Sequence, residues 1–139
     1  MVLPDCERVA EIRIRGRRTA YRGLMPRSYL DALSVAEDAA RRRERFGRGG
    51  GAIVNLVAER VGAGVGRALL MESTARCTAA GHERMLLWVL KENTGARRFY
   101  EQAGFGPDGG EEPFEVDSVA VPEVRYARTL TCPGAEGRR

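Results

Sequence analysis

The sequence predicts an α/β protein in which a mixed sheet is built around one strand–helix–strand unit and flanked by helices. Two short apolar runs, 53–58 and 85–90, have the length and composition of buried strands. Between them, a glycine-rich turn leads directly into a helix-forming stretch, which is the order of a parallel βαβ unit. The 139 residues, 43% hydrophobic and 30% charged, are enough to bury one core. We therefore expect a single domain over residues 1–130 and a disordered tail over 131–139.

The amino-terminal region leaves one element open. In residues 10–15 apolar and charged side chains alternate, as in a strand, whereas Val9 and Ile12, three apart, also fit a helix. Residues 19–26 contain turn-forming glycine and proline and predict a turn.

A helix is predicted next, because Ser34 followed by Glu37 forms a capping box. We expect this helix to run to about Phe46, where the glycine-rich segment 47–51 interrupts it.

The centre of the chain consists of the strand 53–58, the glycine turn, a helix over 65–80 that Gly81 ends, and the strand 85–90. The buried side of this helix is predicted to consist of Val65, Ala68, Leu69, Ala75 and Ala79.

A short helix over 93–104 comes next. Two strands, near 113–120 and 123–130, are then predicted with Pro122 between them.

The glycine turn is the first feature with a chemical meaning. Gly62, Gly64 and Gly66 would leave the amides at a helix start open to a phosphate group, and Arg67 would add a positive charge. A tight turn that binds nothing is the simpler alternative. A Walker A loop is excluded because Arg67 and Ala68 stand where lysine and serine or threonine are required. Arg67 also replaces the third glycine of the dinucleotide-binding fingerprint, which weakens that interpretation.

Two longer stretches, GVGRALLMES and LLWVLKENTGARRFYEQAGFGPDG, resemble the GNAT superfamily of acetyl-CoA-dependent N-acetyltransferases. The first includes the end of the glycine loop, which matches the family's glycine-loop signature over 61–66. The second carries its Asn-x-x-Ala-x-x-Phe-Tyr helix, with the matching residues Asn93, Ala96, Phe99, Tyr100 and the following Gly104 and Phe105.

The resemblance implies a shortened GNAT-like fold and transfer of an acetyl group from acetyl-CoA to an amine by direct attack. It implies that loop amides bind the pyrophosphate, that the first strand pairs with the pantetheine arm, and that Asn93 offers an amide to that arm or caps its helix. The implied cofactor-binding residues are Leu56, Val57, Ala58, Val61, Gly62, Ala63, Gly64, Val65, Gly66, Arg67 and Asn93. The hydroxyl of Tyr100 is implied to protonate the leaving thiolate, the alternative being a packing role beside Phe99.

The chain departs from the family pattern at three points. Val61 replaces the usual arginine or glutamine, and the first strand offers Asn55 but no carboxylate as general base, with Glu59 only at its end. The usual first strand and the hairpin before the signature strand are missing. The shortened sheet would expose an edge, unless residues 10–15 or a second copy in a homodimer cover it.

These departures give the alternative function, a degenerate relative that binds coenzyme A without turnover. The acceptor is expected to be a small-molecule or peptide amine. Three widely spaced cysteines without metal-ligand spacing predict a cytoplasmic protein without a metal cofactor. Arginines spread along the chain, interleaved with acids and few aromatics, argue against nucleic acid, and no apolar run is long enough for a membrane span.

Overall fold

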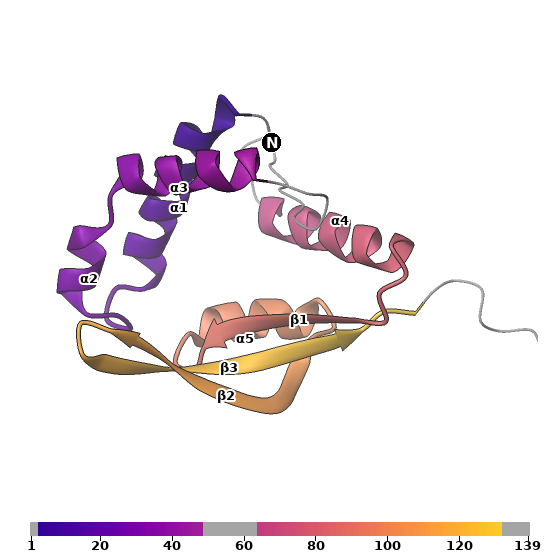
Figure 1. The fold of residues 1–139 in the computed structure, drawn as a ribbon. Coiled ribbons are helices and arrows are strands. Elements are labelled where there is room, and N and C mark those ends of the chain that lie inside the picture. The colour runs from indigo at the N-terminus through magenta and orange to yellow at the C-terminus, as the bar shows by residue number, and fades with distance from the viewer. Residues whose placement is uncertain (1–2, 49–63, 132–139) are drawn as a thin grey trace, which may run out of the picture. The chain divides into compact units, whose positions relative to one another are not determined.

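The computed structural model describes residues 3–48 and 64–131, which fall into two compact units (Figure 1). The first unit comprises Met1–Val57 together with Glu115–Val119, and the second comprises Ala58–Phe114 together with Ala120–Arg139.

The first unit contains three helices, α1 (Asp5–Ala20), α2 (Arg27–Ala32) and α3 (Val35–Gly47). The open question at residues 10–15 is settled in favour of helix. Cys6, Ala10 and Ile14 recur every four residues on α1 and are buried, and α1 packs against α3. The alternation suggested a strand because Ile12 is apolar, but in α1 this side chain is 56% exposed.

Polar contacts at chain reversals fix α2 and α3. The Arg18 guanidinium donates to the carbonyl oxygens of Leu30 (3.1 Å) and Leu33 (2.8 Å) and so ties the end of α1 to α2. The Ser34 hydroxyl accepts from the Glu37 amide (3.3 Å), which confirms the predicted start of α3.

The second unit holds a three-stranded sheet of β1 (Arg84–Leu90), β2 (Gly106–Val116) and β3 (Val119–Thr129). The strand order is β1-β3-β2, so the last strand in the sequence lies in the middle. β1 and β3 are antiparallel, from the pair Arg84–Thr129 to the pair Leu90–Glu123.

The predicted boundary between the last two strands is wrong. The turn falls at Asp117 and Ser118, whose φ angles of 48° and 62° suit a two-residue hairpin turn. Pro122 instead lies within β3. It is tolerated there because the register with β1 ends at Glu123, and Pro122 contributes only its carbonyl, which accepts from the Lys91 amide (2.9 Å).

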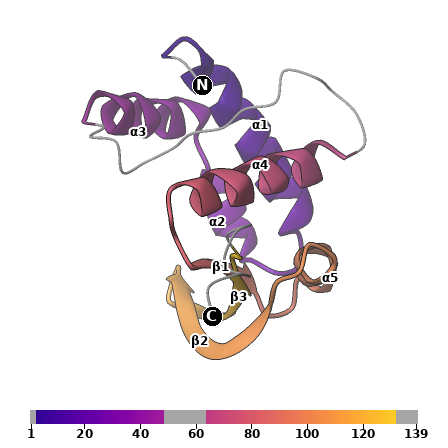
Figure 2. The ribbon, with the colours of Figure 1, turned by 90° about the vertical axis from the view of Figure 1, so that its right-hand side faces the viewer.

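Two helices of this unit, α4 (Val65–Ala79) and α5 (Thr94–Gln102), confirm the predicted helices; α5 is seen down its axis in Figure 2. Gly81 and Gly104, which follow them, have φ angles of 83° and 86°, as expected of glycines that end helices. The predicted buried side of α4 is wrong, however. Leu70 packs against the core and Thr74 is buried, whereas Ala68, Ala75 and Ala79 are exposed.

The core of the second unit lies where β1 and β3 meet these helices. Its buried members are Val89, Phe105, Val124 and Tyr126, packed against Leu70, Met85, Leu87, Ala96, Tyr100 and Ala103. The predicted strand 53–58, its parallel pairing with residues 85–90, and nearly all of the predicted tail lie outside the described residues. None of the helices in the described ranges is long and apolar enough to cross a membrane.

Candidate functional site

The start of α4 is built without a side-chain cap. Gly64 is the N-cap residue, with a φ angle of 91°, and contributes no side-chain acceptor. The helix ladder starts where the Ala68 amide donates to the Gly64 carbonyl (3.0 Å). The three preceding amides, those of residues 65–67, have no acceptor within the helix and can bind an external one.

The charge at this helix start is opposite to that of the longer helices before it. α1 carries Asp5 and Glu7 in its first turn, and α3 carries Glu37 and Asp38, which complement the positive end of the helix dipole. α4 has no acid there and instead exposes Arg67. This end of α4 is suited to an anionic ligand.

Gly66 lies against α5. A Cβ atom on Gly66 would lie 3.6 Å from Cζ of Phe99, which is ordinary van der Waals contact. Phe99 immediately precedes Tyr100, so the first turn of α4 lies near the helix that carries the proposed catalytic tyrosine. The structure therefore brings Gly66 against Phe99 of α5.

Asn93 lies between β1 and α5 and caps the helix. Its side-chain Oδ1 accepts from the backbone amide of Ala96 (3.1 Å), and its backbone amide donates to the Leu90 carbonyl (3.0 Å). This is the capping role that the sequence allowed. The Nδ2 group, the donor that a pantetheine carbonyl would need, has no hydrogen bond recorded among the described residues.

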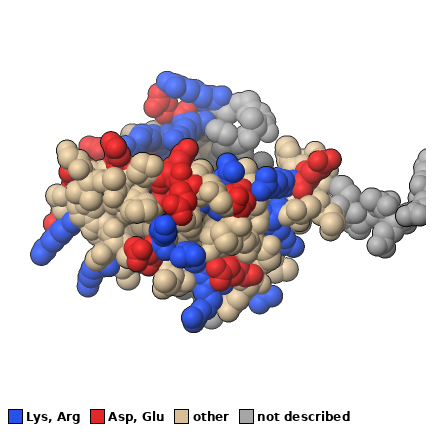
Figure 3. All heavy atoms as spheres, turned by 90° about the horizontal axis from the view of Figure 1, so that it is seen from below, with Lys and Arg blue, Asp and Glu red and all other residues tan. Residues whose placement is uncertain are grey.

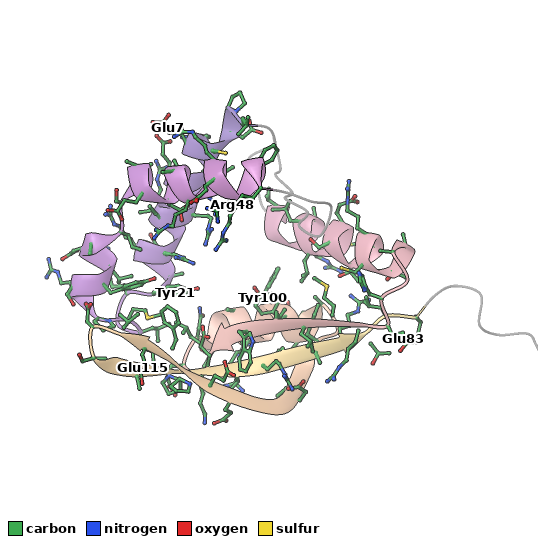
Figure 4. The ribbon with its side chains drawn as sticks, viewed as in Figure 1. Glu7, Tyr21, Arg48, Glu83, Tyr100 and Glu115 are labelled. Atoms are coloured by element: carbon green, nitrogen blue, oxygen red, sulfur yellow. The ribbon has the colours of Figure 1, made fainter. Side chains whose placement is uncertain are left out.

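Tyr100 projects from the last turns of α5 and is half-buried (Figure 4). Its ring meets Phe99 and Phe105 edge to face, with centroids 5.2 and 6.2 Å apart and an interplanar angle of 70° in both pairs. Packing on both sides fixes the ring, as a group that must deliver a proton at one point requires.

A hydrogen-bond network beside Tyr100 was missed by the sequence reasoning. The buried Tyr126 hydroxyl donates to Glu101 Oε1 (2.6 Å) and accepts from Arg97 Nε (2.9 Å). Arg97 also donates to the Lys91 carbonyl (3.0 Å), and the bond with Tyr126 raises the pKa of its guanidinium. The only sequence signal was Tyr126 itself, which shares one face of the strand with Val124, two residues before it.

The remaining predicted site residues lie outside the described residues: Leu56, Val57, Ala58, Val61, Gly62 and Ala63, together with Asn55 and Glu59. Across 3–48 and 64–131, no three His, Cys, Asp or Glu side chains come together as a possible metal site.

Several of the candidate site residues lie within a segment that matches a known protein family. Residues 51–105, less than half of the chain, match the model of the Acetyltransferase (GNAT) family. The matched segment contains α4, β1 and α5, so the resemblance read from the sequence is confirmed there. No curated protein matches the chain in sequence.

The solved structures that resemble the chain include three proteins with the following alignments. That of yncA from Salmonella typhimurium, a proposed acetyltransferase with its cofactor acetyl-CoA, aligns with a TM-score of 0.59 and 14% identity over 100% of this chain and 96% of its own. That of smu.2055 from Streptococcus mutans UA159 aligns with a TM-score of 0.61 and 18% identity over 94% of this chain and 97% of its own. A proposed phosphinothricin N-acetyltransferase aligns over 50% of this chain with 25% identity and a TM-score of 0.45, and this chain spans 43% of that protein.

The first two alignments show the fold. The chain has the mixed α/β fold of these proteins.

Proposed function

We propose that this chain is an N-acetyltransferase of the GNAT type, which moves an acetyl group from acetyl-CoA to an amine by direct attack. The observation that carries the proposal is the uncapped, positively charged start of α4, which lies inside the segment that matches the family. When bound, acetyl-CoA would supply the reactive thioester.

The described residues fit this cofactor. The amides of residues 65–67 and the Arg67 guanidinium would hold the pyrophosphate, since both are donors at the positive end of a helix. Gly64 and Gly66 have no side chain to obstruct an approach to these amides. The predicted contacts of Leu56, Val57, Ala58, Val61, Gly62 and Ala63 with the cofactor belong to the proposal.

Tyr100 is proposed as the general acid. A phenol holds its proton at neutral pH and can give it to a leaving thiolate. Holding the amine and the thioester together would supply a large share of the rate enhancement. The proposed acceptor is a small-molecule or peptide amine. The odd number of cysteines supports a cytoplasmic location for the protein. A homodimer stays a prediction.

One observation favours the alternative, a coenzyme A-binding relative without turnover. Glu101, the carboxylate next to Tyr100, already accepts from the Tyr126 hydroxyl at 2.6 Å. It is therefore poorly placed to act as a general base on an amine.

The first test is calorimetric titration of the protein with acetyl-CoA, with NADH as the control ligand. We expect micromolar binding of acetyl-CoA. It should be lost in Gly64→Glu, because a carboxylate at the head of α4 repels phosphate and because a side chain is strained at the positive φ of Gly64. Binding without release of free thiol across an amine panel would establish the alternative. A folded protein that binds no acetyl-CoA would overturn both functions.

A further inference from the structure

An open cavity of about 330 Å³, a surface depression rather than an enclosed pocket, lies along α1 in the first unit. Arg13, Gly16, Arg17, Ala20 and Tyr21 line it. Tyr21 closes the helix and is labelled in Figure 4. The volume is at the small end of the range for ligand pockets, enough for a compact organic molecule.

Arg17 stands where the buried face of α1 would continue. Cys6, Ala10 and Ile14 form that face, and the next positions along it, three and four residues after Ile14, are Arg17 and Arg18. Arg18 is accounted for by its bonds to two carbonyl groups of the first unit. Arg17 is half-buried, and no partner of its guanidinium is recorded among the described residues.

The second cation of the cavity is only weakly neutralised. Arg13 NH1 lies 4.0 Å from Asp38 Oδ1, at the limit of an ion pair. Asp38 is bonded more closely by Arg42 Nε, at 2.8 Å. Arg13 and Arg17, four residues apart, are neighbours of like charge on one helix, an arrangement that an anion between them would stabilise.

Gly16 leaves the cavity open on its side of α1. Glycine in the middle of a helix is destabilising relative to alanine, so it needs a reason. A Cβ atom on Gly16 would meet nothing within 4 Å, so no close packing explains this glycine. A residue that lowers the stability of its helix and gains no packing contact in exchange is expected at functional positions.

We propose that this cavity binds a small organic oxyanion, a carboxylate or a phosphate ester carried on a flat group. Arg17 and Arg13 bind the oxyanion, the open surface at Gly16 admits the flat group, and the Tyr21 ring packs against it. The lining residues named above belong to the first unit, and their proposed role does not depend on the proposed acetyl transfer.

The test is an NMR titration of the full-length, isotopically labelled protein with benzoate, phenyl phosphate and the neutral analogue benzamide. We expect saturable shifts of the Gly16 and Tyr21 amides with one or both anions and none with benzamide. The preferred anion distinguishes a carboxylate ligand from a phosphate ligand.

Three variants sharpen the test. Arg17→Gln should weaken anion binding about tenfold, since it removes a charge-assisted bond. Gly16→Leu should abolish binding by filling the cavity while retaining a good helix former. Arg15→Gln removes the same charge from an exposed position of α1 outside the cavity and should bind as the wild type does.

The proposal is overturned if neither anion gives a saturable shift at millimolar concentration, or if benzamide shifts the same amides equally. Equal losses in Arg15→Gln and Arg17→Gln would also overturn it, because binding would then follow net charge. Acetyl-CoA titration of the same variants reports the proposed function separately.

Discussion

At the scale of single residues, the proposed chemistry depends most on Tyr100, whose ring is held edge to face between Phe99 and Phe105. We expect Tyr100→Phe to lower kcat about 100-fold, the lower end of what general-acid catalysis contributes, because the phenylalanine ring preserves the packing but has no proton to give. The dissociation constant for acetyl-CoA should change less than about twofold, since the hydroxyl is not proposed to hold the cofactor. Steady-state kinetics with thiol detection and calorimetry on the same samples measure the two quantities.

Phe105→Leu is the matched control for Tyr100→Phe. It loosens one side of the aromatic packing and leaves the Tyr100 hydroxyl in place. It should therefore lower the free energy of unfolding but lower kcat much less than Tyr100→Phe does. A Tyr100→Phe enzyme that retains wild-type kcat would assign Tyr100 to packing alone.

Several residues could be assigned from the sequence because their signals are local. Ser34 and Asn93 cap helices that begin at the next residue, and Gly81 and Gly104 follow the helices that they end. A backbone torsion or a cap involves three or four neighbouring residues, all visible in the sequence. The same local logic identified the glycine turn, of which the structure describes Gly64 and the residues that follow it.

At the scale of elements, the position of α5 on the sheet depends on polar contacts with β3. Tyr126 bonds Arg97 and Glu101 of the helix, and the Arg128 guanidinium donates to the carbonyl of Ala103 (2.9 Å) just after its end. These residues hold both ends of the helix that carries Tyr100.

We expect Tyr126→Phe to lower the free energy of unfolding by about 1–2 kcal/mol, because it removes two hydrogen bonds to charged groups that water can partly replace. Urea denaturation followed by circular dichroism measures the change. Glu101→Gln keeps an acceptor oxygen for the Tyr126 hydroxyl and should cost less. A larger loss in Glu101→Gln than in Tyr126→Phe would contradict this account of the network.

This network could not be predicted, because its members lie 25 and 29 residues apart in the sequence.

The predicted hairpin boundary was wrong for a related reason. Pro122 is a strand breaker by local rules, but whether it breaks a strand depends on where the neighbouring strand ends, which is a matter of register. The buried side of α4 was likewise decided by the sheet beneath it.

At the scale of the whole molecule, many charged side chains of the described residues lie in ion pairs of opposite charge. In the view of Figure 3 basic and acidic side chains are interspersed. Among the acids that the structure describes, Asp108 stands out because it accepts from both Arg125 Nε (2.9 Å) and Arg84 NH2 (2.9 Å). Trp88 packs under the Arg125 guanidinium. Asp108 therefore links all three strands of the sheet, β1 through Arg84, β2 by its own position and β3 through Arg125.

The bond from Arg125, with a second from the Gly110 amide, holds the pKa of Asp108 below its ordinary value of 3.8. A depressed folded-state pKa stabilises the native state above the unfolded-state pKa, and this stabilisation is lost as the pH falls through the folded-state pKa. Below about pH 4 the melting temperature of the wild type should therefore fall more steeply than that of Asp108→Asn. Thermal melts at a series of pH values test this, with the exposed Asp31→Asn as the control that should follow the wild type.

The hairpin tip, Glu115–Val119, clusters with the first unit although both of its strands continue into the second. The Ser28 hydroxyl donates to Asp117 Oδ2 (2.6 Å) across 89 residues of chain. During synthesis, α1, α2 and α3 leave the ribosome long before this tip exists. The first unit is therefore completed late in translation, although its helices can form early. The contacts that complete it need residues made after β1 and α5. A nascent chain stopped before the hairpin would lack these contacts.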